Sequence, residues 1–230
     1  MHSKFPLIGI GASLVQAANR LVVDVVSDVV CPWCFIGKHK LDAAIANLRQ
    51  AEPSLEASVR WHPFELNPDL PAEGIPRTEY LERKWGSVAL AEENYVRVRN
   101  AGEIVGISFR LDRIERQPNT FDAHRVIAWA QGQGDANALV ERLFAAYFIE
   151  GRRVGERDEL ARLAAECGLP QDAAQEMLAS DALKNDVANE AREALDVGVR
   201  GVPFFIFNGR MALSGAHDPE TLLEAIAAAR

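Results

Sequence analysis

The sequence predicts an α/β fold in the order strand–helix–strand, a long helical block, and then strand–strand–helix. Strand-type patterns are confined to residues 21–66 and 198–230, near the two ends of the 230-residue chain. Residues 67–197 show helical periodicity almost throughout. We therefore expect the two outer segments to form one α/β domain, with an inserted all-helical domain between them. The sequence does not decide whether the last part of residues 67–197 belongs to the helical domain or to the α/β domain.

The first outer segment has the pattern of a βαβ unit. Residues 21–26 (LVVDVV) are apolar and β-branched with one exception, which is typical of a central strand buried on both faces. An amphipathic helix is then indicated by apolar residues at i, i+3, i+4 and i+7, namely Leu41, Ala44, Ile45 and Leu48. A second strand is indicated by Val59, Trp61 and Phe64, with Pro63 helping to end it. The crossover between the two strands should be right-handed.

The rest of the chain supplies the helical block and a hairpin. Two apolar helical stripes stand out in the block: Leu139, Val140, Leu143, Phe144, Tyr147 and Phe148, and then Leu160, Leu163, Ala164 and Cys167. Near the C-terminus, Asn208-Gly209 separates residues 204–207 from 210–213, which predicts a hairpin with a two-residue type I′ turn. Asp218 and Pro219 have the residue types of an N-cap and first helical position, so a final helix should follow.

Composition and charge narrow the function classes. The chain has 25 Lys+Arg and 33 Asp+Glu, a net charge of −8, which argues against nucleic acid or an anionic membrane as the main partner. Residues 1–20 form an N-terminal extension with weak features of a secretory signal peptide, because Pro6, Gly9 and Gly11 interrupt its apolar run. We expect a cytoplasmic protein, with a periplasmic or secreted location as the alternative if that extension is a cleaved signal.

The residues Cys31-Pro32-Trp33-Cys34 follow the first strand and open the first helix. A helix N-terminus favours thiolate over thiol at Cys31. Cys34 falls in the first turn, close enough to form a disulfide with Cys31 or to resolve a mixed disulfide. The alternative is half of a zinc site, but zinc needs four ligands and no second Cys/His pair is spaced to complete it. His39 is the one nearby candidate. The pattern favours dithiol–disulfide exchange without a metal or another cofactor.

Gly201-Val202-Pro203 stands directly before the predicted hairpin. With this layout the chain resembles the thioredoxin fold, and specifically the DsbA family of thiol–disulfide oxidoreductases, in which a helical domain is inserted between the two halves of that fold. The segments SDVVCPWCFIGK, RWHPFELNP, PNTFDAHR and GVRGVPFFIFNGR resemble the FrnE-like branch of this family. The resemblance runs from about Leu21 to Ala228.

The resemblance implies roles for particular residues. Cys31 would be the nucleophile, Cys34 the resolving thiol and Pro203 the cis-proline that faces them. Substrate binding would involve Pro32, Trp33 and the backbone of Val202, and His124 is a weaker candidate whose alternative role is packing. The implied partners are protein or peptide thiols and disulfides, with glutathione as a candidate exchange partner, and the chain would be a monomer or a homodimer.

Asp24 is the one carboxylate in the first strand. Burial there would raise its pKa, which would make it a proton acceptor for the Cys34 thiol. The alternative is a structural carboxylate with a bond at the edge of the strand.

The sequence also leaves two alternative functions open. One is a glutathione-dependent isomerase or transferase of the kappa-like, hydroxychromene-carboxylate isomerase type, although such enzymes usually carry Ser where this chain has Cys31. The other is a non-enzymatic, chaperone-like binding protein with an apolar groove in the helical domain.

Overall fold

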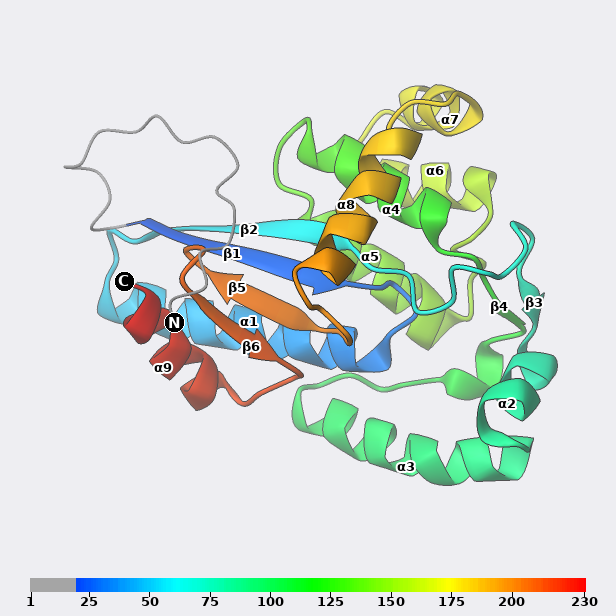
Figure 1. Cartoon of the computed structure of the whole chain (residues 1–230), viewed down its shortest axis with the longest axis horizontal. Coiled ribbons are helices and arrows are strands. Elements are labelled where there is room, and N and C mark those ends of the chain that lie inside the picture. Colours follow the sequence, from blue (N-terminus) through cyan, green and yellow to red (C-terminus); the bar gives the residue numbers. More distant parts are fainter. Residues whose placement is uncertain (1–19) are drawn as a thin grey trace.

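The computed structural model describes residues 20–230, so the predicted signal features before Arg20 lie outside the described residues (Figure 1). Four strands form the main sheet in the order β2-β1-β5-β6. Their bounds are β1 Arg20–Ser27, β2 Glu56–Pro63, β5 Phe204–Phe207 and β6 Met211–Ser214. β1 runs parallel to β2, with Val23 opposite Val59, and β5 runs antiparallel to both β1 and β6. The predicted α/β fold, with βαβ and ββα halves, is confirmed.

Helices cover both faces of this sheet. α1 (Pro32–Ala51) packs against α9 (Pro219–Ala229) on one face, and α8 (Lys184–Asp196) packs against β2 on the other (Figure 1). Successive side chains of a strand point to opposite faces. On β1, the fully buried Leu21, Val23 and Val25 join the core that includes α1, whereas Val26 belongs to a separate small cluster with Ala194 of α8. Asp24 therefore lies on the α8 face.

The insert between β2 and α8 is built mainly of helices. They are α2 Arg77–Trp85, α3 Val88–Ile104, α4 Phe121–Gln131, α5 Asn137–Ala145, α6 Arg157–Glu166 and α7 Gln171–Ala179, with a 3-10 turn at Leu111–Arg113 and a π-helix at Ala146–Glu150 that continues α5. Phe144 and Phe148 of this continuous segment stack on Phe35 of α1, with ring centroids 5.1 and 6.2 Å apart. Aromatic packing thus joins the insert to the helix that carries the cysteines.

Three details differ from the sequence prediction. The insert is not purely helical, because β3 (Ile75–Pro76) and β4 (Arg116–Gln117) form a two-stranded sheet. Strands this short leave no periodic signal. Asn208 and Gly209 have the positive φ values of a type I′ turn (49° and 64°), but Arg210 lies in the loop, since β6 begins at Met211. Cys167, the last residue of the second predicted stripe, lies just past the end of α6 and is only partly buried against the core.

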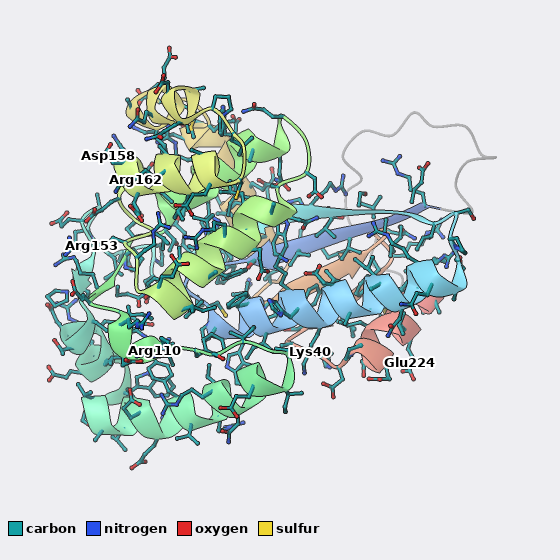
Figure 2. All side chains as sticks on the ribbon, turned by 180° about the vertical axis from the view of Figure 1, so that it is seen from behind. Lys40, Arg110, Arg153, Asp158, Arg162 and Glu224 are labelled. Carbon is teal, nitrogen blue, oxygen red and sulfur yellow. The ribbon has the colours of Figure 1, made fainter. Side chains whose placement is uncertain are left out.

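The described part of the chain contains no helix long and apolar enough to cross a membrane. Charged side chains lie on its outer surface, and Figure 2 labels Lys40, Arg110, Arg153, Asp158, Arg162 and Glu224 among them. α9 begins at Asp218 and Pro219, as predicted. The Asp218 carboxylate does not cap the helix, however. It accepts a hydrogen bond from Lys40 Nζ at 2.6 Å, which ties the start of α9 to α1.

Candidate active site

The two cysteines lie at the junction between β1 and α1. Cys31 is the N-cap residue with an extended backbone, and Pro32 takes the first helical position, where no N–H is needed. The Cys31 carbonyl accepts a hydrogen bond from the Cys34 N–H at 3.0 Å, which places both side chains at the same helix end. Both are free thiols and nearly buried, whereas Trp33 between them is 37% exposed. Of the four residues of this motif, Trp33 is therefore the one that reaches the surface most.

The loop before β5 lies directly against Cys31. The Val202–Pro203 peptide bond is cis, and the Cys31 thiol donates to the Val202 carbonyl at 3.6 Å. Close packing with α1 holds this loop in place. A Cβ on Gly37 would lie 2.9 Å from Pro203 Cγ and 3.2 Å from Phe205 Cζ, so this approach needs a glycine. The structure therefore brings the Cys31–Cys34 motif together with the Val202–Pro203 loop. Cys31 and Val202, which are in contact, are 171 residues apart in the sequence.

Cys34 is the more deeply buried thiol, at 1% exposure. Burial raises the pKa of Cys34 well above its ordinary value, and its hydrogen bond with Cys31 raises it further. The Ser27 side chain and the Asp28 backbone oppose this shift by hydrogen bonding to the sulfur, but burial outweighs them. Cys34 is therefore a thiol at neutral pH and must lose a proton before it can act as a nucleophile.

Asp24 does not have the environment that the sequence predicted. Its carboxylate accepts hydrogen bonds from Arg60 at 2.6 and 2.8 Å and from His62 Nε2 at 2.9 Å, all on the α8 face of the sheet. Burial raises the pKa of Asp24, but the hydrogen bonds from His62 and Arg60 outweigh burial and lower it. The predicted rise in pKa is wrong. This is the structural carboxylate of the alternative interpretation, on the opposite face of β1 from the helix that carries Cys34.

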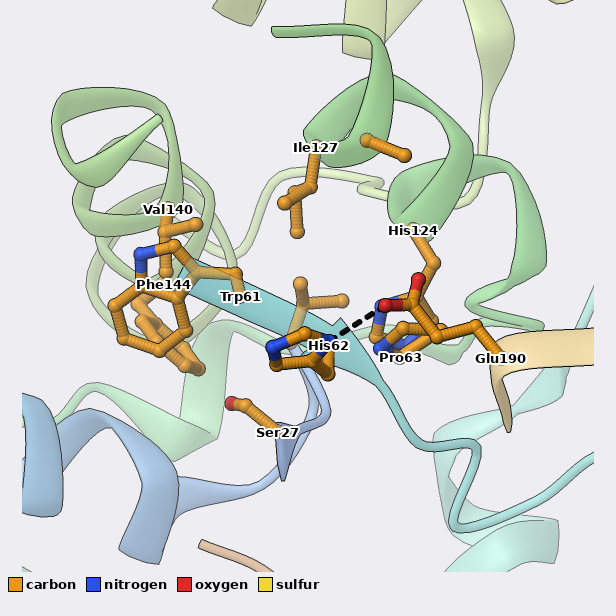
Figure 3. Close-up of a pocket in the computed structure, with 11 residues that line it drawn as sticks. Ser27, Trp61, His62, Pro63, His124, Ile127, Val140, Phe144 and Glu190 are labelled. Atoms are coloured by element: carbon orange, nitrogen blue, oxygen red, sulfur yellow. Dashed lines mark hydrogen bonds and ion pairs between the residues drawn. The ribbon is translucent and has the colours of Figure 1, made fainter. Parts of the chain in front are cut away.

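His62, which the sequence left unassigned, links three elements through this carboxylate. Nε2 contacts Asp24 of β1, and Nδ1 contacts Glu190 of α8 at 2.5 Å, across a small pocket that Ser27 and His124 also line (Figure 3). Burial lowers the pKa of His62, but the hydrogen bonds to Asp24 and Glu190 raise it to about 9. Both ring nitrogens donate to carboxylates, so the ring is an imidazolium that ties α8 to the sheet.

His124 and Asp28 lie close to each other in the interior of the protein. His124 is 5% exposed, and its Nε2 donates to the Phe64 carbonyl at 3.1 Å and lies 3.7 Å from Asp28 Oδ1. This is the arrangement of a buried packing residue. Asp28 is 0% exposed and was missed in the sequence interpretation. The signal that could have identified it is a second carboxylate, between the first strand and the cysteines, three positions before Cys31.

Among residues 20–230, no three His, Cys, Asp or Glu side chains are arranged to hold a metal ion. His39 was the nearby candidate for completing a zinc site with the cysteines. Its ring nitrogens instead contact the Val105 carbonyl and Glu141 Oε1, each at 3.0 Å.

Comparison with known proteins places the chain in a family. A model of the DSBA-like thioredoxin domain matches residues 22–227. The uncharacterized protein YwbO of Bacillus subtilis is 25% identical over 209 residues, which cover 89% of this chain and 94% of that protein. The structure of the probable DsbA oxidoreductase SCO1869 from Streptomyces coelicolor is 29% identical, with a TM-score of 0.80, over 91% of this chain and 89% of that one.

The cytosolic disulfide reductase DsbM from Pseudomonas aeruginosa, solved with GSH, is 19% identical with a TM-score of 0.56, over 90% of this chain and 94% of that one. At this identity the likeness shows the fold alone. The family match spans almost all of the described chain, including the strand before Cys31 and the hairpin after Pro203. The chain therefore belongs to the DSBA-like thioredoxin domain family, a family of DsbA-type thiol–disulfide oxidoreductases.

Proposed function

We propose that this protein exchanges disulfides with protein or peptide thiols through the Cys31–Cys34 pair, as an oxidoreductase or isomerase. The observation that carries the proposal is the placement of Cys31 at the start of α1, with its sulfur 3.6 Å from the Val202 carbonyl. A helix N-terminus stabilises a thiolate there. The family match supports the same chemistry.

The proposed reaction has two steps. The Cys31 thiolate attacks one sulfur of a substrate disulfide, so a Cys31–substrate S–S bond forms, the substrate S–S bond breaks, and the leaving thiolate takes up a proton. Cys34 then loses its proton and attacks the Cys31 sulfur, which forms the Cys31–Cys34 disulfide and releases the second substrate thiol. The substrate disulfide is reduced and the protein dithiol is oxidised by two electrons. Run in reverse, the same steps oxidise a substrate dithiol.

Substrate binding is proposed at the edge where Trp33 is exposed. An extended peptide would pair with the backbone of Val202 as a short added strand, while Pro32 and Trp33 contact its side chains. The buried His124 has no exposed edge to offer a peptide and is left out of this proposal. Glutathione is included as an exchange partner, since DsbM, which shares the fold, was solved with GSH.

A cytoplasmic location belongs to the proposal as well. The intact mass of the protein isolated from its native cell tests this location. A cleaved signal peptide would remove most of residues 1–20 and contradict it.

A redox titration in glutathione buffers, with alkylation of free thiols by a mass tag, tests the exchange chemistry. We expect two tags to be lost together in the wild type and in the matched control Cys167→Ser, whose half-buried thiol lies past α6. Cys31→Ser should abolish exchange, and Cys34→Ser should accumulate mixed disulfides. A potential near roughly −120 to −180 mV would indicate an oxidase or isomerase, and one near roughly −270 mV a reductase.

Retained exchange in Cys31→Ser, or no intramolecular disulfide at any glutathione ratio, would contradict the proposal. In the second case, turnover of a small electrophile with glutathione would be the next assay, because it would favour the isomerase or transferase alternative.

A further inference from the structure

A cavity in the helical insert is separate from the candidate active site. Its volume is about 230 Å³, and neither the Cys31–Cys34 motif nor the Val202–Pro203 loop lines it. Four segments form its walls: the loop before β3, β4 with the residue after it, the π-helix Ala146–Glu150, and the loop before α6, whose Arg153 lies on the outer surface (Figure 2). π-Helical turns are rare and occur often at functional sites. This volume lies below the roughly 300–1,000 Å³ of pockets for drug-sized ligands, so the cavity suits a small metabolite.

Glycines allow the walls of the cavity to lie close together. Gly74 has a positive φ of 69°, and a Cβ at this position would collide with the Gln117 carbonyl across the β3–β4 pair. A Cβ on Gly155 would lie 2.8 Å from Pro118 Cβ. Contacts this close fix the loop before α6 against the end of β4. The cavity is therefore preformed in the folded chain, and a ligand does not have to order its walls.

The cavity presents one cation and one anion that lack a charged partner. Arg116 Nε donates to the Glu73 carbonyl at 3.2 Å, and Nη2 donates to the carbonyls of Glu73 and Gly74 at 3.1 and 2.9 Å. These bonds fix the guanidinium beside the Glu73 backbone and leave Nη1 without a partner in the described chain. Among residues 20–230, neither Arg116 nor the exposed Glu73 carboxylate forms an ion pair. Arg153 and Glu156, which also line the cavity, pair with each other at 3.0 Å, so their charges largely cancel.

A buried arginine lies behind the floor of the cavity. Arg77 is 9% exposed and donates to the hydroxyls of Tyr95 at 2.5 Å and Tyr147 at 3.4 Å. It also donates to the side-chain carbonyl of Gln117, which accepts from the Tyr147 hydroxyl at 3.0 Å, and Tyr147 lines the cavity. Within residues 20–230, no carboxylate pairs with Arg77, and neither its Nε nor Gln117 Nε2 has a hydrogen-bond partner. A buried cation without a counter-ion is costly, so it favours a negatively charged group at the cavity floor.

We propose that this cavity binds a small zwitterion, an α-amino acid. The carboxylate of the ligand pairs with Arg116, its ammonium pairs with Glu73, and its side chain contacts Pro118 and the ring of Tyr147. The two charged groups of an α-amino acid are attached to one carbon, and Arg116 is correspondingly held beside the Glu73 backbone. A phosphate fits less well, because Glu73 and Glu156 repel a doubly charged anion. This inference goes beyond disulfide exchange and does not depend on it.

Isothermal titration calorimetry of the full chain with L-alanine, L-leucine and L-phenylalanine tests the proposal. We expect the tightest of the three to bind at one site with a dissociation constant of about 1 mM or lower, a modest affinity for so few atoms. Two analogues of that amino acid are the matched controls. Its amide lacks the carboxylate and should bind at least tenfold more weakly, because it loses the pair with Arg116. The corresponding acid without the amino group should bind at least threefold more weakly, because it loses the pair with the exposed Glu73.

Variants of the lining residues test the same contacts from the protein side. Arg116→Gln should weaken binding of that amino acid at least tenfold, and Glu73→Gln at least threefold. Arg97→Gln, at an exposed arginine of α3, is the matched control and should stay within twofold of the wild type. If circular dichroism shows that Arg116→Gln is not folded, Ala72→Trp decides the matter. Ala72 is exposed at the cavity wall, so a tryptophan there should block binding while Arg116 keeps its hydrogen bonds.

The proposal is overturned if none of the three amino acids shows saturable binding, or if either analogue binds within twofold of its parent amino acid. Equal effects of Arg116→Gln and Arg97→Gln, or retained binding in folded Ala72→Trp, would overturn it as well. Failure of the proposed function looks different, because these titrations measure the heat of binding and involve no thiol. A chain that forms no Cys31–Cys34 disulfide would still bind the amino acid.

Discussion

Replacing Gly37 by alanine tests the close packing between α1 and the loop that carries Pro203. The added Cβ would lie 2.9 Å from Pro203 Cγ, in a ring that cannot rotate away, and 3.2 Å from Phe205 Cζ. Alanine in a helix interior is normally more stable than glycine by about 0.5–1 kcal/mol. Overpacking a close-fitting site costs about 1–3 kcal/mol. The difference predicts a destabilisation of about 1 kcal/mol, and roughly 2.5 kcal/mol at most.

For a chain of this size, 1 kcal/mol lowers Tm by about 2–4 °C. Urea unfolding of Gly37→Ala, followed by circular dichroism, measures the free energy directly. Gly201→Ala is the matched control in the same loop, because a Cβ there meets no described atom within 4 Å. Disulfide exchange should slow in Gly37→Ala only, since a displaced Pro203 also moves the Val202 carbonyl away from Cys31. A Gly37→Ala protein more stable than the wild type would refute this account of the contact, because the helix-propensity gain would then be unopposed.

Two further predictions concern buried charged groups outside the Cys31–Cys34 pair. The pKa of His62 is raised from 6.5 to about 9, so its contribution to stability is fully present below pH 6.5 and is lost as the pH rises through 9. Urea unfolding should show that the free energy of unfolding falls by on the order of 3 kcal/mol between pH 6 and pH 9.5. His62→Gln should remove most of this pH dependence. An equal pH dependence in the variant would contradict the assignment to His62. Arg125 is fully buried and donates to Asp122 and to the carbonyls of Met177, Ser180 and Ala182. Arg125→Met should lower the free energy of unfolding by about 3–5 kcal/mol. The control Arg162→Met, at an exposed arginine, should lower it by about 1 kcal/mol or less (Figure 2). Equal effects would show that the buried contacts of Arg125 do not stabilise α4 against α7.

Features that depend on neighbours in sequence could be predicted well. The dithiol needs a three-residue spacing and a helix start, and both are visible in Cys31-Pro32-Trp33-Cys34. The turn at Asn208-Gly209 needs two positive φ values, which these residue types tolerate, and both angles are observed. Even here the strand boundary shifted by one residue at Arg210, because register depends on pairing with β5 and not on the turn residues alone.

The electrostatics of the site depended on the tertiary structure. Asp24 gained Arg60 and His62 from 36 and 38 residues away, and these partners reversed the direction that burial alone would give its pKa. The surroundings of Asp28 likewise depend on Leu66 and His124, which approach it only after β2 and α4 are packed. The sequence by itself determined the chemistry available at Cys31 and Cys34 and the order of the elements around them. The partners of each buried carboxylate were decided only by the folded structure, because the charge of a group depends on what surrounds it in space, whereas a turn or a helix start depends on the residues next to it in the chain.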